Sequence, residues 1–179
     1  QMQGAVYYYD FDGYIYNDLL TSSGGFHGDP VYRHEQKDAW FTGIEWQLDY
    51  DVTRNWRWFL RADFVHARLK EGSNKNLPRT PPVTTNSGVK WYSNNWQVNA
   101  DVKYYAEQTE VADNESSTSG YSVINLYVAF TQPLPKSSVQ VYLKAHNLAD
   151  EFGRNHVSYL KEYSPVIGRN VNLGVTYSF

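Results

Sequence analysis

The chain has 179 residues and a mass of 20.7 kDa, which suits one domain or a piece of a larger one. Its formal charge of −3 is too balanced for a nucleic-acid-binding protein, and the absence of cysteine excludes disulfides and cysteine-ligated metal sites. No apolar run approaches the roughly 18 residues of a transmembrane helix, and Gln1–Gly4 carry no signal-peptide features. Aromatic residues make up 17% although mean hydropathy is −0.61, which leaves open a membrane protein that spans by strands.

The dominant period along the chain is two, as in β-strands. The last ten residues show it most clearly, because Val171, Leu173 and Val175 alternate with Asn172 and other polar or small residues. We predict eight strands, at about Gly4–Tyr16, Thr42–Tyr50, Trp56–Phe64, Pro82–Tyr92, Trp96–Ala106, Ser122–Phe130, Ser138–His146 and Asn170–Phe179.

The connections alternate in length. Short turns are expected at Thr53–Asn55, Ser93–Asn95 and Pro133–Lys136, and long polar loops at about Asn17–Lys37, Lys70–Pro81, Thr109–Gly120 and Asp150–Gly168. Short turns at one end and long loops at the other are typical of an antiparallel outer-membrane β-barrel. A soluble barrel or sandwich would have shorter, more even loops.

Aromatic residues gather near the expected strand ends. Five of them lie near the short turns (Trp56, Trp58, Trp91, Trp96 and Tyr177), and Tyr7, Tyr9 and Tyr104 lie further along their strands. Such placement is expected for the two aromatic girdles of a transmembrane barrel.

Three segments carry a family resemblance. Lys144–Phe152, with the sequence KAHNLADEF, is similar to the "NL(F/T)D…Y" signature after the penultimate strand of TonB-dependent outer-membrane receptors. The ending Gly168–Phe179 resembles the "PGRN…L.L.Y.F" final strand of that family, and Tyr7–Tyr16 with Gly43–Trp46 resembles its "FYNDFKDYI…GIE" strand pair. Pro30–Ala39 and His156–Glu162 resemble the zinc-uptake branch.

The resemblance implies that the chain is part of a receptor that transports a cargo across the outer membrane. Members have a TonB box, a plug and a barrel of about 22 strands, so residues 1–179 look like the last third of a barrel without plug, TonB box or earlier strands. The implied partners are outer-membrane lipid, the barrel-assembly machinery, which would read Tyr177 and Phe179, and the TonB complex, which would act through the missing plug. The implied cargo is a scarce metal or metal chelate, zinc or a ferric siderophore, with no resident cofactor.

The loops supply candidate binding residues. His27, His34 and His156 could capture a metal ion with nearby carboxylates, because imidazole and carboxylate are zinc ligands. The ligand-binding candidates are His27, Asp29, His34, Glu35, His156 and Glu162. Exposed histidines without specific metal binding are the alternative. Four aromatic loop residues could instead contact a siderophore or other chelate: Phe26, Tyr32, Phe152 and Tyr159.

The expected inner wall is polar. Its residues include Glu45, Asp49, Arg57, Arg61, Asp63, Asp101, Lys103 and Lys144, for which hydration and cross-strand ion pairing are the expected roles. No catalytic motif is present, and we do not expect an enzyme. The alternative function is a self-contained eight-stranded barrel acting as adhesin or structural anchor, which requires Gly4–Tyr16 to pair with Arg169–Phe179; a hydrolytic barrel would need a Ser–His pair near the rim.

Overall fold

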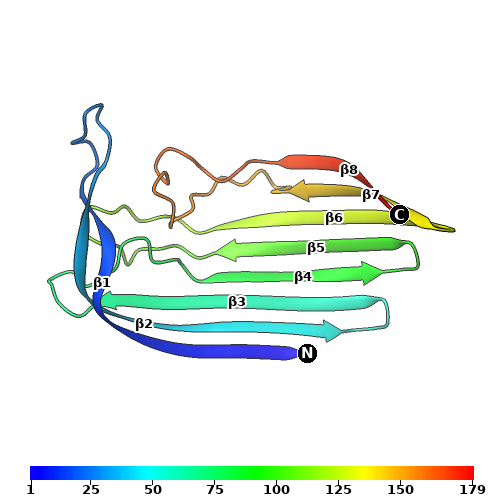
Figure 1. Cartoon of the computed structure of the whole chain (residues 1–179), viewed down its shortest axis with the longest axis horizontal. Helices are drawn as coiled ribbons and strands as arrows, with labels where there is room; N and C mark the ends of the chain where they lie inside the picture. The colour runs from blue at the N-terminus through cyan, green and yellow to red at the C-terminus, as the bar shows by residue number, and fades with distance from the viewer.

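The computed structural model describes all residues, 1–179, and consists of one antiparallel sheet. Its strands are β1 (Met2–Thr21), β2 (Val31–Asp51), β3 (Trp56–Leu69), β4 (Thr84–Tyr92), β5 (Trp96–Tyr105), β6 (Tyr121–Leu134), β7 (Ser137–His146) and β8 (Asn170–Ser178). Each strand pairs with the next along the chain, so the eight predicted strands and their up-and-down order are confirmed (Figure 1). No helix in the chain has the length and apolar character needed to cross a bilayer.

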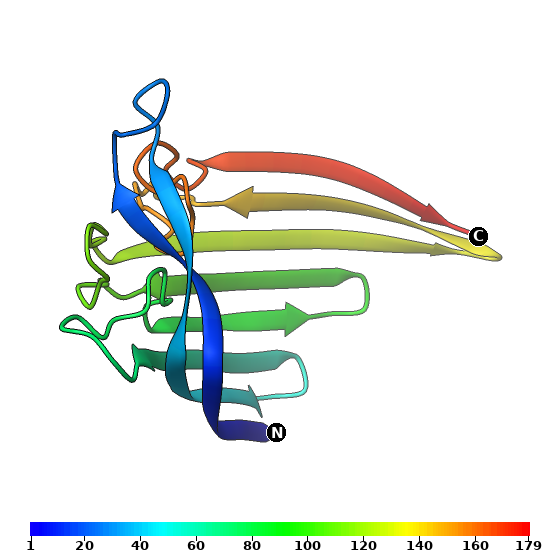
Figure 2. The same cartoon turned by 60° about the vertical axis from the view of Figure 1, so that its left-hand side comes forward.

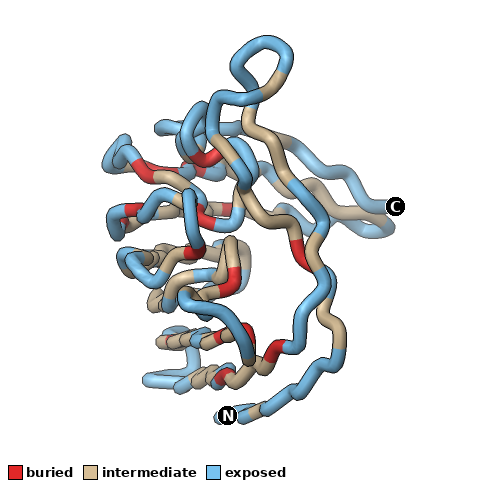
Figure 3. Tube along the Cα trace, turned by 90° about the vertical axis from the view of Figure 1, so that its left-hand side faces the viewer, coloured by how far each residue is buried: buried red, intermediate tan, exposed pale blue.

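The sheet is curved but open. β1 and β8 are its two edges and do not pair with each other (Figures 1 and 2). The self-contained barrel requires that pairing, so the structure does not favour it. Seen from the end with the long loops, which we call the loop end, the backbone curves around a concave side (Figure 3).

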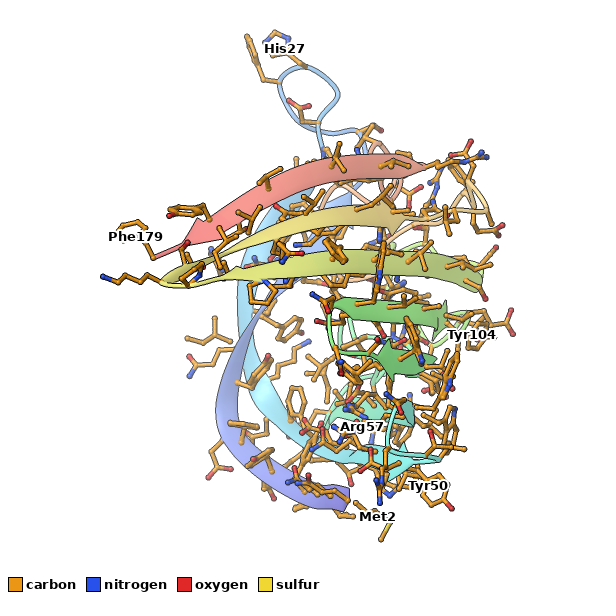
Figure 4. The ribbon with its side chains drawn as sticks, turned by 90° about the vertical axis from the view of Figure 1, so that its right-hand side faces the viewer. Met2, His27, Tyr50, Arg57, Tyr104 and Phe179 are labelled. Carbon is orange, nitrogen blue, oxygen red and sulfur yellow. The ribbon has the colours of Figure 1, made fainter.

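The two faces of the sheet differ as the alternation predicts. On the convex face, Val141 pairs with Val175, and Val141 and Val171 leave 40% and 57% of their surface exposed. On the concave face Lys144 pairs with Asn172. Tyr50 and Tyr104 point away from the concave side and Arg57 points toward it (Figure 4). A sheet with one exposed apolar face and one polar face is the arrangement expected between lipid and a water-filled barrel interior.

The aromatic residues at the short-turn end lie as predicted, whereas two at the loop end do not. Trp56 and Trp91 have ring centres 6.3 Å apart on the convex face. Tyr7 and Tyr9 instead lie on the concave face, because Gly43 on β2 leaves room for the Tyr7 ring to cover it. On the convex face the loop-end aromatic residues include Tyr8 and Trp40, which stack with ring centres 6.4 Å apart.

The prediction of a long loop at Asn17–Lys37 is wrong. β1 continues to Thr21 and β2 begins at Val31, so that only residues 22–30 form the connection. Pairs such as Asn17 with His34 continue the ladder. These residues lie beyond the apolar convex surface. Because no lipid contacts them, their sequence need not alternate between apolar and polar residues, which is the pattern from which the strands were predicted.

The extended hairpin bends across the loop end. The register shifts between Phe11 and Tyr14, where Gly13 has a φ of +70° and donates its N–H to Asp38 Oδ1 at 2.7 Å. Such a bulge bends a strand pair. Beyond it, residues 13–38 run across the outer ends of the other strands, and we call this segment the strap (Figures 1 and 3).

A small buried cluster holds the strap down. Tyr16 on the strap packs with Ala39, with Ala67 and Leu69 of β3, and with Leu77 of the β3–β4 loop. Burial of these apolar side chains stabilises the position of the strap, because it removes their apolar surface from water. The strap and the loops therefore form one packed unit at the loop end.

Candidate functional site at the loop end

The histidines proposed as metal ligands lie in three different settings. His27 is at the tip of the β1–β2 connection with Asp29, far out from the sheet (Figure 4). His34 is exposed on the strap, and the neighbouring Glu35 pairs with Arg33. His156 is buried. The structure contains no group of three or more His, Asp or Glu side chains placed to hold a metal ion.

Glu115, in the β5–β6 loop, joins three loops through one carboxylate. Its Oε1 accepts hydrogen bonds from the backbone N–H of Arg79 at 2.9 Å and from Lys161 Nζ at 3.1 Å. Its Oε2 accepts from the N–H of Ala112 at 3.1 Å, within its own loop. Glu115 thus ties the β3–β4 and β7–β8 loops to the β5–β6 loop.

His156 completes this buried cluster. Its Nδ1 lies 3.0 Å from Thr118 Oγ1, and its Nε2 lies 3.4 Å from Glu115 Oε1, which is long for a hydrogen bond. Lys161 also donates to the carbonyl of Ser116 at 2.8 Å. The side chains of His156 and Glu115 are only 1% and 6% exposed. His156, proposed as a ligand, is therefore a packing residue of the loops in this structure.

The contacts of Glu115 lower the pKa of its carboxyl group. Burial alone would raise this pKa, but His156, the charge of Lys161 and the N–H groups of Ala112 and Arg79 outweigh burial and lower it to about 2. Glu115 is therefore ionised at any physiological pH. The buried ion pair of Glu115 and Lys161 is also hydrogen-bonded by the N–H groups of Ala112 and Arg79, so removing one partner would leave a buried charge uncompensated.

Two residues of the Asn-Leu-x-Asp signature, Asn147 and Asp150, make hydrogen bonds within the β7–β8 loop. Asn147 is fully buried with a φ of +51°; its Nδ2 donates to the carbonyls of Glu151 and Ile167, and its Oδ1 accepts from the N–H of Glu151. Asp150 Oδ1 accepts the N–H of Arg169 at 2.8 Å. The motif therefore joins the start of the long β7–β8 loop to its end, at the loop end of the sheet.

A polar pocket of about 390 Å³ opens between the strap and these loops. Arg79 forms its central wall: the guanidinium carbon lies 4.0 Å from the centre of the Tyr159 ring and 5.7 Å from that of Tyr32. The Tyr32 and Tyr159 rings meet edge to face with centres 5.2 Å apart. Arg79 Nη2 donates to the carbonyl of Asn17 at 3.3 Å, and Asn17 donates to the hydroxyl of Tyr159.

The guanidinium of Arg79, unlike the ammonium of Lys161, makes no ion pair with a carboxylate of the polar pocket. Of the carboxylates lining the pocket, Glu115 binds Lys161 and Glu162 binds Arg154 at 2.6 Å. The third, Asp113, accepts a hydrogen bond from Asn74 at 3.0 Å. Arg79 has a φ of +57°, a conformation that non-glycine residues seldom adopt outside constrained sites. The pocket thus presents a guanidinium that lies against two tyrosine rings.

Sequence reasoning identified part of this pocket. Tyr32 and Tyr159 were predicted as chelate contacts and meet in the structure, whereas Phe26 is at the strap tip and Phe152 lies outside the pocket lining. Glu162 lines the pocket. Arg79 was not predicted from the sequence, although a signal existed: it is the only arginine of its loop and lies between Pro78 and Pro81, whose fixed φ angles stiffen the segment.

The concave wall carries the predicted ion pairs in part. Arg61 pairs with Asp49 at 2.8 Å and Arg57 pairs with Asp51 at 2.6 Å, each between neighbouring strands. Lys103 and Lys144 instead place their ammonium groups over tyrosine rings, and Asp101 accepts a hydrogen bond from Asn125. The remaining two wall residues, Glu45 and Asp63, lie opposite each other on β2 and β3. None of these eight wall residues lines the polar pocket.

Comparison with known proteins identifies the family. Residues 1–148 match the family described as TonB dependent receptor-like, beta-barrel. The chain belongs to this family. Its members are outer-membrane proteins of Gram-negative bacteria, and the exposed apolar face of the sheet agrees with that location.

Solved structures of similar fold are receptors and transporters. The copper transporter OprC superposes with a TM-score of 0.83 at 19% identity, over 100% of this chain and 29% of that protein. BauA, the ferric preacinetobactin receptor of Acinetobacter baumannii, gives a TM-score of 0.70 at 14% identity over 99% and 27%. The ferric enterobactin receptor PfeA of Pseudomonas aeruginosa gives 0.64 at 15% over 99% and 29%. This chain therefore spans less than a third of each.

Proposed function

We propose that residues 1–179 are the last third of a barrel of about 22 strands in a TonB-dependent receptor that also has a plug. Three features support this: the open edges at β1 and β8, the short fraction of each structural neighbour that the chain spans, and the resemblance of its ending to the final strand of the family. In this proposal the loop end faces outward, the TonB complex acts through the plug, and the barrel-assembly machinery reads Tyr177 on β8 and Phe179, which follows β8.

We infer that the receptor takes up a metal as an anionic chelate, which the loops capture in the polar pocket. The observation that carries this inference is Arg79, held between Tyr32 and Tyr159 without a carboxylate partner. A guanidinium pairs with catecholate, carboxylate or phosphate oxygens through charge-assisted hydrogen bonds, and the tyrosine rings add stacking surface. A bare metal cation would be repelled by the same group.

Direct capture of zinc by His27, His34 and His156 stays a prediction. If it occurs, replacing the three histidines by alanine in the intact receptor should abolish Zn²⁺ binding. Unchanged Zn²⁺ binding would remove them from the list of ligands.

The chelate proposal is tested by binding to the purified intact receptor. Ferric enterobactin serves as the anionic probe, and Zn²⁺ and Cu²⁺ serve as cationic probes. We expect Arg79→Gln to weaken ferric enterobactin binding by about tenfold or more, because one charge-assisted hydrogen bond contributes roughly 1.5–3 kcal/mol. Arg33→Gln is the matched control, since Arg33 lies on the strap outside the polar pocket. Binding of only the bare cations would contradict the proposal.

A further inference from the structure

A second, apolar pocket lies beneath the strap. It has a volume of about 580 Å³, within the range of roughly 300–1,000 Å³ typical of small-molecule sites. Nine of its fifteen lining residues are hydrophobic. Its walls come from β1, β2, β3, the β3–β4 loop and the β7–β8 loop, and include Tyr14, Phe41, Val65 and Val157.

The two pockets share a wall. Pro78, Arg79 and Tyr159 line both of them. The guanidinium of Arg79, packed on the Tyr159 ring, therefore lies between the two pockets. A ligand whose anionic part meets Arg79 has an apolar space immediately beside that contact.

Aromatic rings continue from the apolar pocket along the concave side. Tyr14 and Phe41 have ring centres 5.1 Å apart, and Phe11 lies 5.4 Å from each of them. Tyr9 and Tyr7 follow on the same face of β1 toward the middle of the sheet, at 6.1 Å and 5.3 Å from ring to ring. The apolar pocket is thus the outer end of an aromatic surface that runs inward and is continuous with the site.

We propose that the apolar pocket binds an alkyl or aryl appendage of the chelate whose anionic head occupies the polar pocket. The ligand is then an amphipathic metal chelate. This inference rests on the proposed function and adds to it the chemistry of the cargo. Its physical basis is that burying each methylene of such an appendage removes apolar area from water, whereas the head gains its binding energy from Arg79.

The test compares two ferric catecholate complexes that share one head. The ligands are N-methyl-2,3-dihydroxybenzamide and N-octyl-2,3-dihydroxybenzamide, whose ferric complexes have the same charge and differ only in the alkyl group. On the intact receptor we expect the octyl complex to bind at least about tenfold more tightly than the methyl complex, since several methylenes become buried.

A substitution that fills the apolar pocket identifies where the alkyl group lies. Val157 lines the apolar pocket but not the polar one, so Val157→Trp should reduce the ratio of octyl-complex to methyl-complex affinity toward one. Val83→Trp is the matched control: Val83 is 39% exposed like Val157 but lies outside both pockets, and its variant should keep the preference.

The outcomes separate this inference from the proposed function. Equal binding of both complexes to the unaltered receptor overturns the inference and leaves chelate capture intact. An octyl preference that survives Val157→Trp, or that Val83→Trp abolishes equally, also overturns it, because the alkyl group then lies elsewhere. Failure of both complexes to bind overturns the proposed function and, with it, the inference.

Discussion

At the scale of single residues, Glu115 is the group on which the order of the loops depends most. Glu115→Gln keeps the shape but leaves Lys161 buried without a countercharge, and breaking such a pair costs on the order of 3–5 kcal/mol. We expect hydrogen exchange in residues 106–120 and 147–169 to accelerate strongly, while exchange in β3 to β7 stays slow. Glu110→Gln is the control, since Glu110 is about half exposed. Equal exchange in the two variants would contradict the role of Glu115.

The same carboxylate sets the acid tolerance of the loops. The pKa of Glu115 is lowered from 4.5 to about 2, so the stability it contributes is fully present above pH 4.5 and is lost as the pH falls toward 2. We expect loop protection from proteolysis to persist at pH 5 and to decline between about pH 4.5 and 2. In Glu115→Gln the protection should already be low at pH 7 and lack this acid transition. Loss of loop order in the unaltered protein between pH 7 and pH 5 would contradict the assignment.

At the scale of elements, Gly13 decides where the strap bends. A Cβ at this position would lie 2.5 Å from Gln36 Nε2, and its φ of +70° disfavours any L residue. Gly13→Ala should destabilise the strap by at least about 1 kcal/mol and weaken binding at both pockets, because the strap forms a wall of each. Gly28→Ala is the control for the cost of placing an alanine at a positive φ, since Gly28 has a φ of +82° and an added Cβ would have no atom within 4 Å. Equal effects of the two substitutions on ligand affinity would show that the bend does not shape the site.

The strands could be predicted from the sequence wherever lipid imposes a pattern. Val171, Leu173 and Val175 alternate with polar residues because one side of β8 is apolar, and there both the strand and its face were predicted correctly. The strap lies beyond the apolar surface, so Asn17 and His34 pair as strand residues without showing the period.

The site was predictable only in part, for a different reason. Tyr32 and Tyr159 are aromatic residues in polar segments and could be singled out as binding residues. Their contact with Arg79 brings together residues 47 and 80 positions apart in sequence, through a bend that depends on Gly13. No local sequence pattern predicts this contact, and Glu115 was missed because most of its partners, including Lys161 and His156, lie on other loops.

At the scale of the whole molecule, the sheet is one wall between lipid and water. Its edges, β1 and β8, carry unpaired backbone groups, which lipid cannot satisfy. Within the proposed receptor, further strands of the same barrel pair with both edges. The chain then contributes a continuous part of the barrel wall, and its packed loops cover the outer end of that part.

The assignment of the lipid face makes a prediction that compares two adjacent residues of β8. Val175 lies on the convex face opposite Val141, and Thr176 lies on the concave face opposite Gln140. Val175→Arg places a charge in lipid and should cost roughly 2–4 kcal/mol, the typical value for arginine near the bilayer midplane, whereas Thr176→Arg meets water and should cost little. Urea titration of the intact receptor in bilayers, together with its level in the outer membrane, measures both effects. Because the two positions are adjacent on one strand and receive the same arginine, the difference in cost depends chiefly on the face, and a larger cost at Thr176 would place the lipid on the other side of the sheet.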